Sequence, residues 1–290
     1  MMARLFAALS VLACGCGLVS GLDSLVVVDG AAPSDASVLD APDANDANDA
    51  LDETVVDAND DTREASVNTA LDLAGGCATA TSTISLTNSA FSVELWLDLT
   101  SVQTNTAASI VWNGGRNVNE PGWSIDVVPA GVELCVASST GSKCTTPAGI
   151  PENHLVHVVV TSSIGVAAST RTLSLYALDQ TASETTHTLL SSATAAPNTW
   201  ASTSPFTVGG AFAQTCSGTI QGVIDRLRIF SVVLSVADMN ASMSTDACSA
   251  PNVLYDFEFD EGSGTTTTSC VGATSLTLVS SASFVPSPFP

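Results

Sequence analysis

The chain has 290 residues, of which 45% are hydrophobic and only 12% are charged, and its formal net charge is −22. So acidic a chain repels phosphate backbones and anionic membrane surfaces, and it lacks the electrostatic attraction that drives nucleic-acid binding. Its richness in Thr, Ser, Val and Gly favours many short strands joined by turns, which predicts an all-β protein.

Residues 1–22 have the pattern of an export signal. A short basic start, MMAR, precedes the apolar run LFAALSVLA, which is too short to span a bilayer. The segment VLAC resembles a bacterial lipobox, although Val11 stands where Leu is usual. The resemblance implies lipidation of Cys14 and anchoring to the bacterial envelope, and Gly15 in place of Asp favours the outer membrane or cell surface. Cleavage before Cys16, or a plain secretory signal without a lipid, is the alternative.

Residues 23–69 are predicted to form a disordered acidic linker. Thirteen of the 29 acidic residues lie from Asp23 to Glu64, and the stretch has no aromatic residue. Such a composition buries too little apolar surface to offset chain entropy. The Asp-Ala-Asn repeats could instead bind calcium, but they lack the glycine and the bidentate glutamate of a calcium loop. We therefore expect a flexible spacer in front of one folded domain at 70–290.

The folded region reads as one strand after another. In FSVELWLD, residues 91–98, apolar residues alternate with Ser, Glu, Trp and Asp, so one face of the strand is apolar. GWSIDVVPAGVELCVAS, residues 122–138, predicts a hairpin that turns at Pro129, Ala130 and Gly131. Many such segments with almost no helix predict two antiparallel sheets packed face to face.

Six cysteines lie in the folded region, and an even number in an exported chain predicts disulfides. Cys135 and Cys144 flank a predicted turn, so we expect them to pair. The remaining pairing is open, and our expectation is Cys77 with Cys270 and Cys216 with Cys248. A metal site is disfavoured because the domain has no Cys-x-x-Cys, and His154 and His157, three apart on a predicted strand, would lie on opposite faces.

Four motifs occur in an order that resembles the LamG-like, or concanavalin A-like lectin/glucanase, family. GVIDRLRIFSVVLSVADM, residues 222–239, is similar to a family strand followed by a short helix. FSVELWLDL, HLVHVVVT and LYDFEFDEGSGTTTTS are similar to three other family strands. The resemblance covers about 70–283 and implies an antiparallel two-sheet jelly roll. The chain departs from the pattern at Leu155 instead of Trp, at Arg226 instead of an acid, and in two added cysteine-bearing loops.

The strand at 222–230 raises a question about a buried charge. Asp225 is in phase with apolar Val223, Leu227 and Ile229, so its carboxylate is predicted to face the apolar side, where it needs a partner. Ser235 with Asp238 three residues later predicts a helix N-cap. We expect that short helix to cover one end of the sandwich as scaffold.

The family resemblance also raises the possibility of glycoside hydrolysis, because DFEFDEG places Asp256, Glu258 and Asp260 on one strand face. Family glucanases carry E-x-D-x-E or E-x-D-x-x-E, which this run does not match. A serine hydrolase has no support, since no G-x-S-x-G occurs and no nucleophile is evident for His154, His157 or His187.

Binding residues are expected in rim loops, as the family resemblance implies. The loop NGGRNVNEPG, residues 113–122, offers Arg116, Asn117, Asn119 and Glu120, and nearby Asp126 is the candidate ligand for a calcium ion. A solvated hairpin loop is the alternative. Two tryptophans complete the set of candidate ligand contacts, Trp96 and Trp123, which could stack on sugar rings or simply pack in the core.

The sequence thus favours an exported, tethered, non-catalytic recognition module for glycans or for envelope or extracellular proteins. A carbohydrate-active hydrolase using Glu258 and Asp260 is the first alternative. A structural or adhesive module that pairs with another protein and binds no sugar is the second.

Overall fold

The computed structural model describes residues 68–289 except 87–88, 102–106, 118, 166–170, 196–201, 203, 211–215, 217–219 and 246. The predicted signal at 1–22, the lipidated Cys14 and nearly all of the predicted linker lie outside the described residues. Within the described part, no helix is both long enough and apolar enough to cross a membrane.

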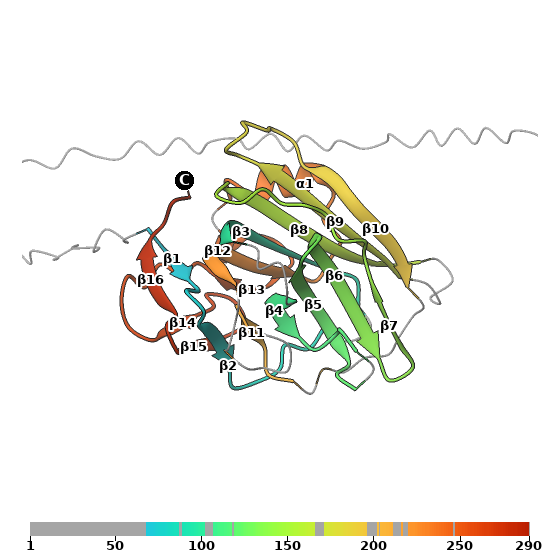
Figure 1. Cartoon of the computed structure of the whole chain (residues 1–290), viewed down its shortest axis with the longest axis horizontal. Helices are drawn as coiled ribbons and strands as arrows, with labels where there is room; N and C mark the ends of the chain where they lie inside the picture. The colour runs from blue at the N-terminus through green and yellow to red at the C-terminus, as the bar shows by residue number, and fades with distance from the viewer. Residues whose placement is uncertain are drawn as a thin grey trace, which may run out of the picture. The chain divides into compact units, whose positions relative to one another are not determined.

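The described residues fold into two antiparallel sheets (Figure 1). In spatial order, one sheet consists of β10 (Thr188–Ala195), β9 (Arg171–Asp179), β8 (Val156–Ile164), β3 (Phe91–Ser101), β12 (Gln221–Phe230), β1 (Thr69–Asp72) and β16 (Ser283–Pro286), with β13 (Val253–Phe257) also paired to β12. The other consists of β14 (Thr266–Thr268), β15 (Ser275–Val279), β2 (Cys77–Ala80), β11 (Thr207–Val208), β4 (Ala108–Asn113), β5 (Gly122–Val128), β6 (Gly131–Ser138) and β7 (Gly141–Cys144). A short helix, α1 (Val236–Ser242), and a 3-10 turn at Ala247–Ser249 follow β12.

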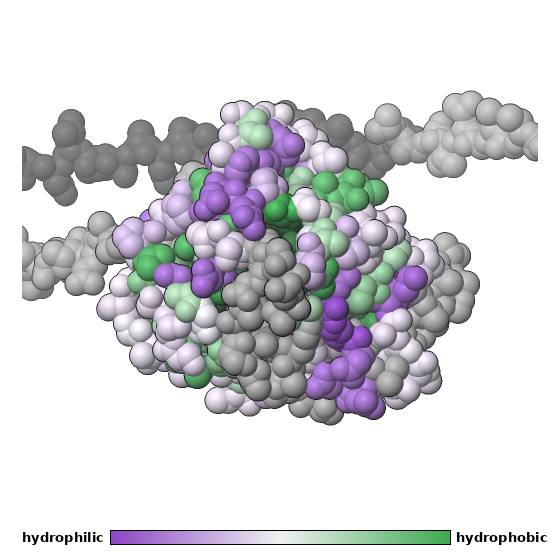
Figure 2. Space-filling view, viewed as in Figure 1, coloured by the Kyte–Doolittle hydropathy of each residue, from purple (hydrophilic) through white to green (hydrophobic). Residues whose placement is uncertain are grey.

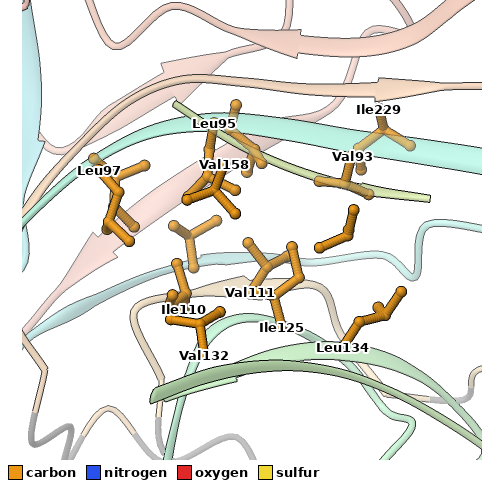
Figure 3. Close-up of a cluster of buried hydrophobic side chains, with 14 of the residues drawn as sticks. Val93, Leu95, Leu97, Ile110, Val111, Ile125, Val132, Leu134, Val158 and Ile229 are labelled. Carbon is orange, nitrogen blue, oxygen red and sulfur yellow. The ribbon is translucent and has the colours of Figure 1, made fainter. Parts of the chain in front are cut away.

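The core lies between the two sheets, as the alternating pattern predicts. Side chains of β3 and β8, such as Leu95 and Val158, face Ile125 and Leu134 of the hairpin β5–β6 (Figure 3). Because successive strand residues point to opposite faces, one apolar residue in two is enough to fill this space. The predicted all-β, two-sheet fold is therefore confirmed, and so is the hairpin at 122–138.

A bulge in β12 overturns the predicted orientation of Asp225. Pairing with β3 moves from Asp225 opposite Trp96 to Arg228 opposite Glu94, so β12 has one extra residue. Arg226 carries that irregularity with a φ of 46°. An inserted residue reverses the phase of the strand. Asp225 therefore lies on the outer face of the sheet, where it is buried by other parts of the chain.

Helix α1 begins with the predicted cap. Ser235 accepts a hydrogen bond from the Asp238 backbone N–H, and the Asp238 carboxylate accepts one from Ser235 in return. The helix does not close an end of the sandwich as expected. Its Met239 packs with Val159 and Phe230, whose side chains lie on the outer face of the β3-containing sheet. The helix also contacts polar groups of that face, because the Ser242 hydroxyl donates to Glu94 and the Ser242 carbonyl accepts from Arg228.

All six domain cysteines form disulfides, and one of the three predicted pairs is correct. Cys135 and Cys144 lie opposite each other on β6 and β7. The other two pairs are Cys77–Cys216 and Cys248–Cys270, which corrects the expected Cys77–Cys270 and Cys216–Cys248. The reason is the route of the chain: the Cys270 backbone N–H donates to the Asp256 carbonyl, which places Cys270 beside β13 and the turn that carries Cys248.

Candidate functional site

The predicted binding loop is folded onto the outer face of β5 and β6 by Arg116. Its guanidinium Nη1 lies 3.0 Å from Asp126 Oδ2 and 2.8 Å from Glu133 Oε1. The preceding residue must be glycine, because Gly115 has a φ of 99° and an added Cβ would collide with the Trp123 backbone. Arg116 therefore serves the attachment of its own loop.

Asp126, the candidate metal ligand, is fully buried within this network. The hydroxyls of Ser109 and Ser124 donate to its two oxygens at 2.6 and 2.8 Å. Burial raises the pKa of Asp126 to about 6, and the hydrogen bonds and the Arg116 charge oppose that rise. A cation bound here would have to displace the guanidinium.

The remaining loop candidates bond to one another; Asn117 and Asn119 are exposed and Glu120 is half-buried. The Asn117 amide donates to Glu120 Oε2 at 2.9 Å, and Asn117 Oδ1 accepts from the Asn119 backbone N–H at 3.0 Å. These contacts shape the loop tip, which leaves Glu120 the most accessible acid of the predicted set.

Trp96 and Trp123 are buried, so the structure corrects their proposed role as exposed stacking platforms. Trp123 packs in the core against Phe91 and Phe206. Trp96 lies on the outer face, but the C-terminal segment covers it, with the Phe289 ring 5.8 Å away. Both rings therefore act as packing elements.

A polar cleft of about 340 Å³ opens on the outer face of the β3-containing sheet. Its lining residues come from three separate segments between β12 and the residues after β13. All five are polar: Arg226, Ser244, Thr245, Glu258 and Asp260. The sequence singled out Glu258 and Asp260, but as alternative catalytic groups, and it missed the other three as site residues. The β12 motif contained the signal for Arg226, which stands where the family pattern has an acid.

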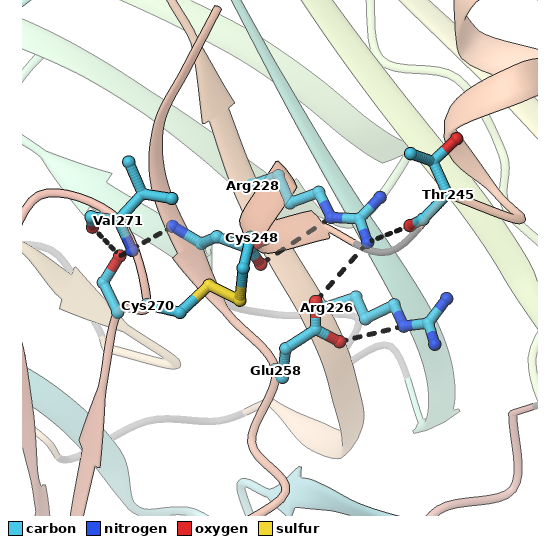
Figure 4. The surroundings of a disulfide bond; sticks show 9 residues. Arg226, Arg228, Thr245, Cys248, Glu258, Cys270 and Val271 are labelled. Atoms are coloured by element: carbon cyan, nitrogen blue, oxygen red, sulfur yellow. Dashed lines mark hydrogen bonds and ion pairs between the residues drawn. A yellow bond between two sulfur atoms is a disulfide. The ribbon is translucent and has the colours of Figure 1, made fainter. Parts of the chain in front are cut away.

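Glu258 lies between two guanidinium groups (Figure 4). Arg226 Nε is 3.0 Å from Glu258 Oε2, and Arg228 Nη2 is 3.4 Å from Glu258 Oε1. Asp260 Oδ1 accepts a hydrogen bond from the Thr69 backbone N–H at 2.9 Å, and burial raises the pKa of Asp260. These contacts hold both carboxylates in place at the mouth of the cleft.

Behind the cleft, Arg228 organises a buried ionic layer. Its Nη1 donates to Glu94 Oε1 at 3.0 Å and to the Ser242 carbonyl of α1 at 2.8 Å. Its Nε lies 3.6 Å from Asp256 Oδ1, although neither Asp256 oxygen accepts a hydrogen bond. Burial, followed by the negative charge of Glu258, raises the pKa of Asp256 to about 8.

Two buried histidines continue this layer toward α1. His157 Nδ1 lies 2.8 Å from His187 Nε2, and His187 Nδ1 donates to Asn240 Oδ1 at 2.6 Å. Burial lowers the pKa of both rings, so both are neutral at neutral pH. His154 precedes β8 instead of lying on it, and its Nδ1 is 2.6 Å from Asp179 Oδ2. The histidines are thus part of the scaffold.

These features define a lectin-type β-sandwich with a polar cleft, and comparison with known proteins gives the family. Residues 73–240 match the model of the concanavalin A-like lectin/glucanases superfamily, and the chain belongs to this family. No curated protein matches the chain.

Two solved structures illustrate the likeness. A candidate carbohydrate binding protein from Bacteroides ovatus ATCC 8483 superposes with a TM-score of 0.55 at 12% identity, over 77% of this chain and 61% of that protein. The binding domain of botulinum neurotoxin DC, solved in complex with SialylT, gives a TM-score of 0.39 at 14% identity, over 53% of this chain and 35% of that one. At such identities the first comparison establishes the fold alone.

Proposed function

We propose that this protein is a non-catalytic recognition module that binds glycans in the cleft between Arg226 and Asp260. The observation that carries the proposal is a cleft lined only by polar side chains on a lectin-type sandwich. Membership of a family that contains lectins, and the fold shared with a candidate carbohydrate binding protein, support it.

The chemistry of the cleft suits sugar hydroxyls. Carboxylates accept two hydrogen bonds from neighbouring hydroxyls, and a guanidinium donates two in a fixed geometry. Glu258 and Arg226 present these groups side by side, and the hydroxyls of Ser244 and Thr245 add adaptable donors and acceptors. Hydrophilic residues also gather in groups on the face shown in Figure 2, where apolar areas are small and scattered. Such a surface favours polar ligands.

The carboxylates of the cleft are arranged for binding better than for hydrolysis. A glycosidase needs two carboxyl groups free to act on opposite sides of the scissile bond. Glu258 is engaged by both Arg226 and Arg228, and Asp260 by the backbone of Thr69. We therefore propose that these groups orient a bound sugar without cleaving it.

The proposal extends to location. An export signal with lipidation at Cys14 and a flexible acidic linker at 23–69 would display the domain at the bacterial cell surface. A flexible tether raises the local concentration of a weak binding domain without fixing its orientation.

The test is a glycan array probed with the exported protein, with and without calcium, followed by titration calorimetry of the hits. The Asp260→Asn variant is expected to weaken glycan binding about ten-fold, as the loss of a charge-assisted hydrogen bond does. Glu120→Gln removes one charge from the rival loop and should bind like the wild type. A blank array with folded protein, or binding lost only in Glu120→Gln, would refute the assignment. Release of reducing ends that stops in Glu258→Gln would show a hydrolase.

A further inference from the structure

The three disulfides of the described domain differ in how far solvent reaches them. In two of them the first cysteine is fully buried and the second is half-buried: Cys77–Cys216 and Cys135–Cys144. Both cysteines of the third pair, Cys248 and Cys270, are exposed (Figure 4). A thiolate must approach a sulfur atom directly in order to exchange with a disulfide, so exposed disulfides are the labile ones. Cys248–Cys270 is therefore the pair that an external thiol reaches most readily.

A buried carboxyl group lies beside these two exposed sulfurs. One carboxyl oxygen of Asp256 and the Sγ atoms of Cys248 and Cys270 all lie within 4.8 Å of one another. The Cys270 backbone N–H donates to the Asp256 carbonyl at 3.0 Å, which keeps the two residues side by side. A sulfur that is freed by cleavage needs only a rotation of its side chain, or one bridging water, to meet the carboxyl group.

The surroundings of Asp256 hold a proton on this carboxyl group at neutral pH. Burial is the first cause and the negative charge of Glu258 the second, and they raise the pKa of Asp256 to about 8. The charge of Glu94 adds to the rise, whereas Arg228, whose Nε lies 3.6 Å from Asp256 Oδ1, opposes it. Asp256 can thus give a proton to a neighbouring atom, and Arg228 then compensates the carboxylate that remains.

We propose that Cys248–Cys270 is a thiol–disulfide exchange site, with Asp256 as its proton donor and a dithiol as its co-reactant. The inference goes beyond glycan binding and does not depend on it. It assigns a covalent reaction to a pair of cysteines that otherwise only cross-links the chain.

The reaction takes two steps. In the first, one thiol of the dithiol loses its proton to water and attacks one sulfur to form a mixed disulfide, while the other sulfur leaves and takes the proton of Asp256. In the second, the Asp256 carboxylate takes the proton of the remaining thiol, which attacks the mixed disulfide, and the departing cysteine takes a proton from water. Two electrons pass to the protein: the dithiol becomes a disulfide, and both cysteines become thiols.

Reduction at this site should loosen the loop that forms one wall of the cleft. The disulfide closes the segment 248–270, which carries Glu258 and Asp260. Residues 258–265 lie between β13 and β14 and belong to neither strand. Without the cross-link this stretch gains conformational freedom, whereas β13 remains paired with β12.

The experiment is stepwise reduction of the full exported protein with dithiothreitol at neutral pH, followed by alkylation of free thiols and peptide mass spectrometry. We expect Cys248 and Cys270 to be alkylated at least about ten-fold faster than the other domain cysteines. Hydrogen exchange in the partly reduced protein should become faster within 258–265 and stay unchanged in β5 and β6. Equal rates for all three pairs would overturn the inference, because reduction would then follow global unfolding.

Asp256→Asn tests the proton donor. The amide keeps the shape of the carboxyl group but has no acidic proton, so exchange at Cys248–Cys270 should slow at least about ten-fold. Glu261→Gln makes the same carboxyl-to-amide change at an exposed position of the same loop and should exchange like the wild type. Slowing to the same extent in both variants, or an unchanged rate in Asp256→Asn, would remove Asp256 from the reaction and refute the site as proposed.

The wild type supplies a measurement that needs no variant. The rate constant for exchange, expressed per thiolate of dithiothreitol, should fall as the pH rises through about 8, because Asp256 then loses the proton that it donates. A rate constant per thiolate that stays level across this range would contradict proton donation by Asp256.

Discussion

Asp225 shows how one residue can make the protein more stable in acid than in base. It is buried on the outer face of the sheet, where Ser287 Oγ donates to one oxygen and the Arg226 backbone N–H to the other. Burial is the largest influence and raises the pKa of Asp225 from its ordinary value of 3.8 to about 7. A raised pKa means that the folded state favours the protonated acid. The resulting stabilisation is complete below pH 3.8 and is lost as the pH rises through about 7.

Asp225→Asn is therefore expected to stabilise the protein at pH 8 and to have little effect at pH 4. The amide mimics the protonated acid at every pH, and the Ser287 hydroxyl can turn to accept from it. We expect a gain on the order of 1–3 kcal/mol at pH 8, measured by chemical denaturation across the pH range. A constant difference between variant and wild type from pH 4 to pH 8 would contradict the assignment.

Asp238→Asn is a matched control with the opposite sign. Hydrogen bonds from Ser235 lower the pKa of Asp238, which is exposed. A lowered pKa stabilises the folded state above pH 3.8, and that contribution disappears as the pH falls. At pH 8 we therefore expect Asp238→Asn to be less stable than the wild type and Asp225→Asn to be more stable. Both differences in the free energy of unfolding should shrink as the pH falls.

Among the elements, those set by local pattern were predictable. Local patterns predicted three features correctly: the alternation in β3, the turn of the β5–β6 hairpin and the cap of α1. Each depends only on residues that are neighbours in the sequence. The bulge at Arg226 could not be predicted from the sequence, because it depends on tertiary pairing. Residues of β12 before the bulge pair with β1, and those after it pair with β13. The burial of Trp96 was equally hidden, since it depends on Phe289 at the far end of the chain.

The cap of α1 should contribute measurably to the stability of the outer face. The helix has seven residues and no basic residue in its last turn, so its capping box and the packing of Met239 hold it in place. Ser235→Ala removes the hydroxyl that accepts from the Asp238 backbone N–H, while the backbone N–H at 235 can still donate to Asp238, and the change should cost about 1 kcal/mol. In a domain of this size we expect the Tm to fall by about 2–4 °C, measured by calorimetry.

Ser139→Ala is the control for that variant, because Ser139 is an exposed turn residue between β6 and β7. It should leave the Tm unchanged. An equal fall in both variants would mean that the box contributes nothing of its own. A larger loss of stability in Ser235→Ala would instead mean that α1 also stabilises the buried ion pairs around Glu94. Ser242 of this helix donates to Glu94 Oε2 at 2.6 Å.

At the scale of the whole molecule, the cleft could not be read from the sequence because its walls belong to three separate segments whose packing is set by the tertiary structure. Arg226 lies in the bulge of β12, Thr245 lies beyond α1, and Asp260 follows β13. The disulfide between Cys248 and Cys270 closes the loop that contains Asp260. Family-level strand motifs place the strands correctly, but only the three-dimensional pairing brings these side chains together.

The net charge of the whole chain bears on the proposed attachment to the envelope. With a net charge of −22, the protein is repelled by anionic lipid headgroups, so a membrane association would depend on the lipid at Cys14. Cys14→Ala should move the protein from the membrane fraction to the soluble exported fraction, and the wild type should carry the mass of its acyl chains. Cys16→Ala is the control and should stay with the membrane. If Cys16→Ala alone releases the protein, the anchor is at Cys16. If both single variants and the double variant stay bound, the attachment does not use a lipidated cysteine at all.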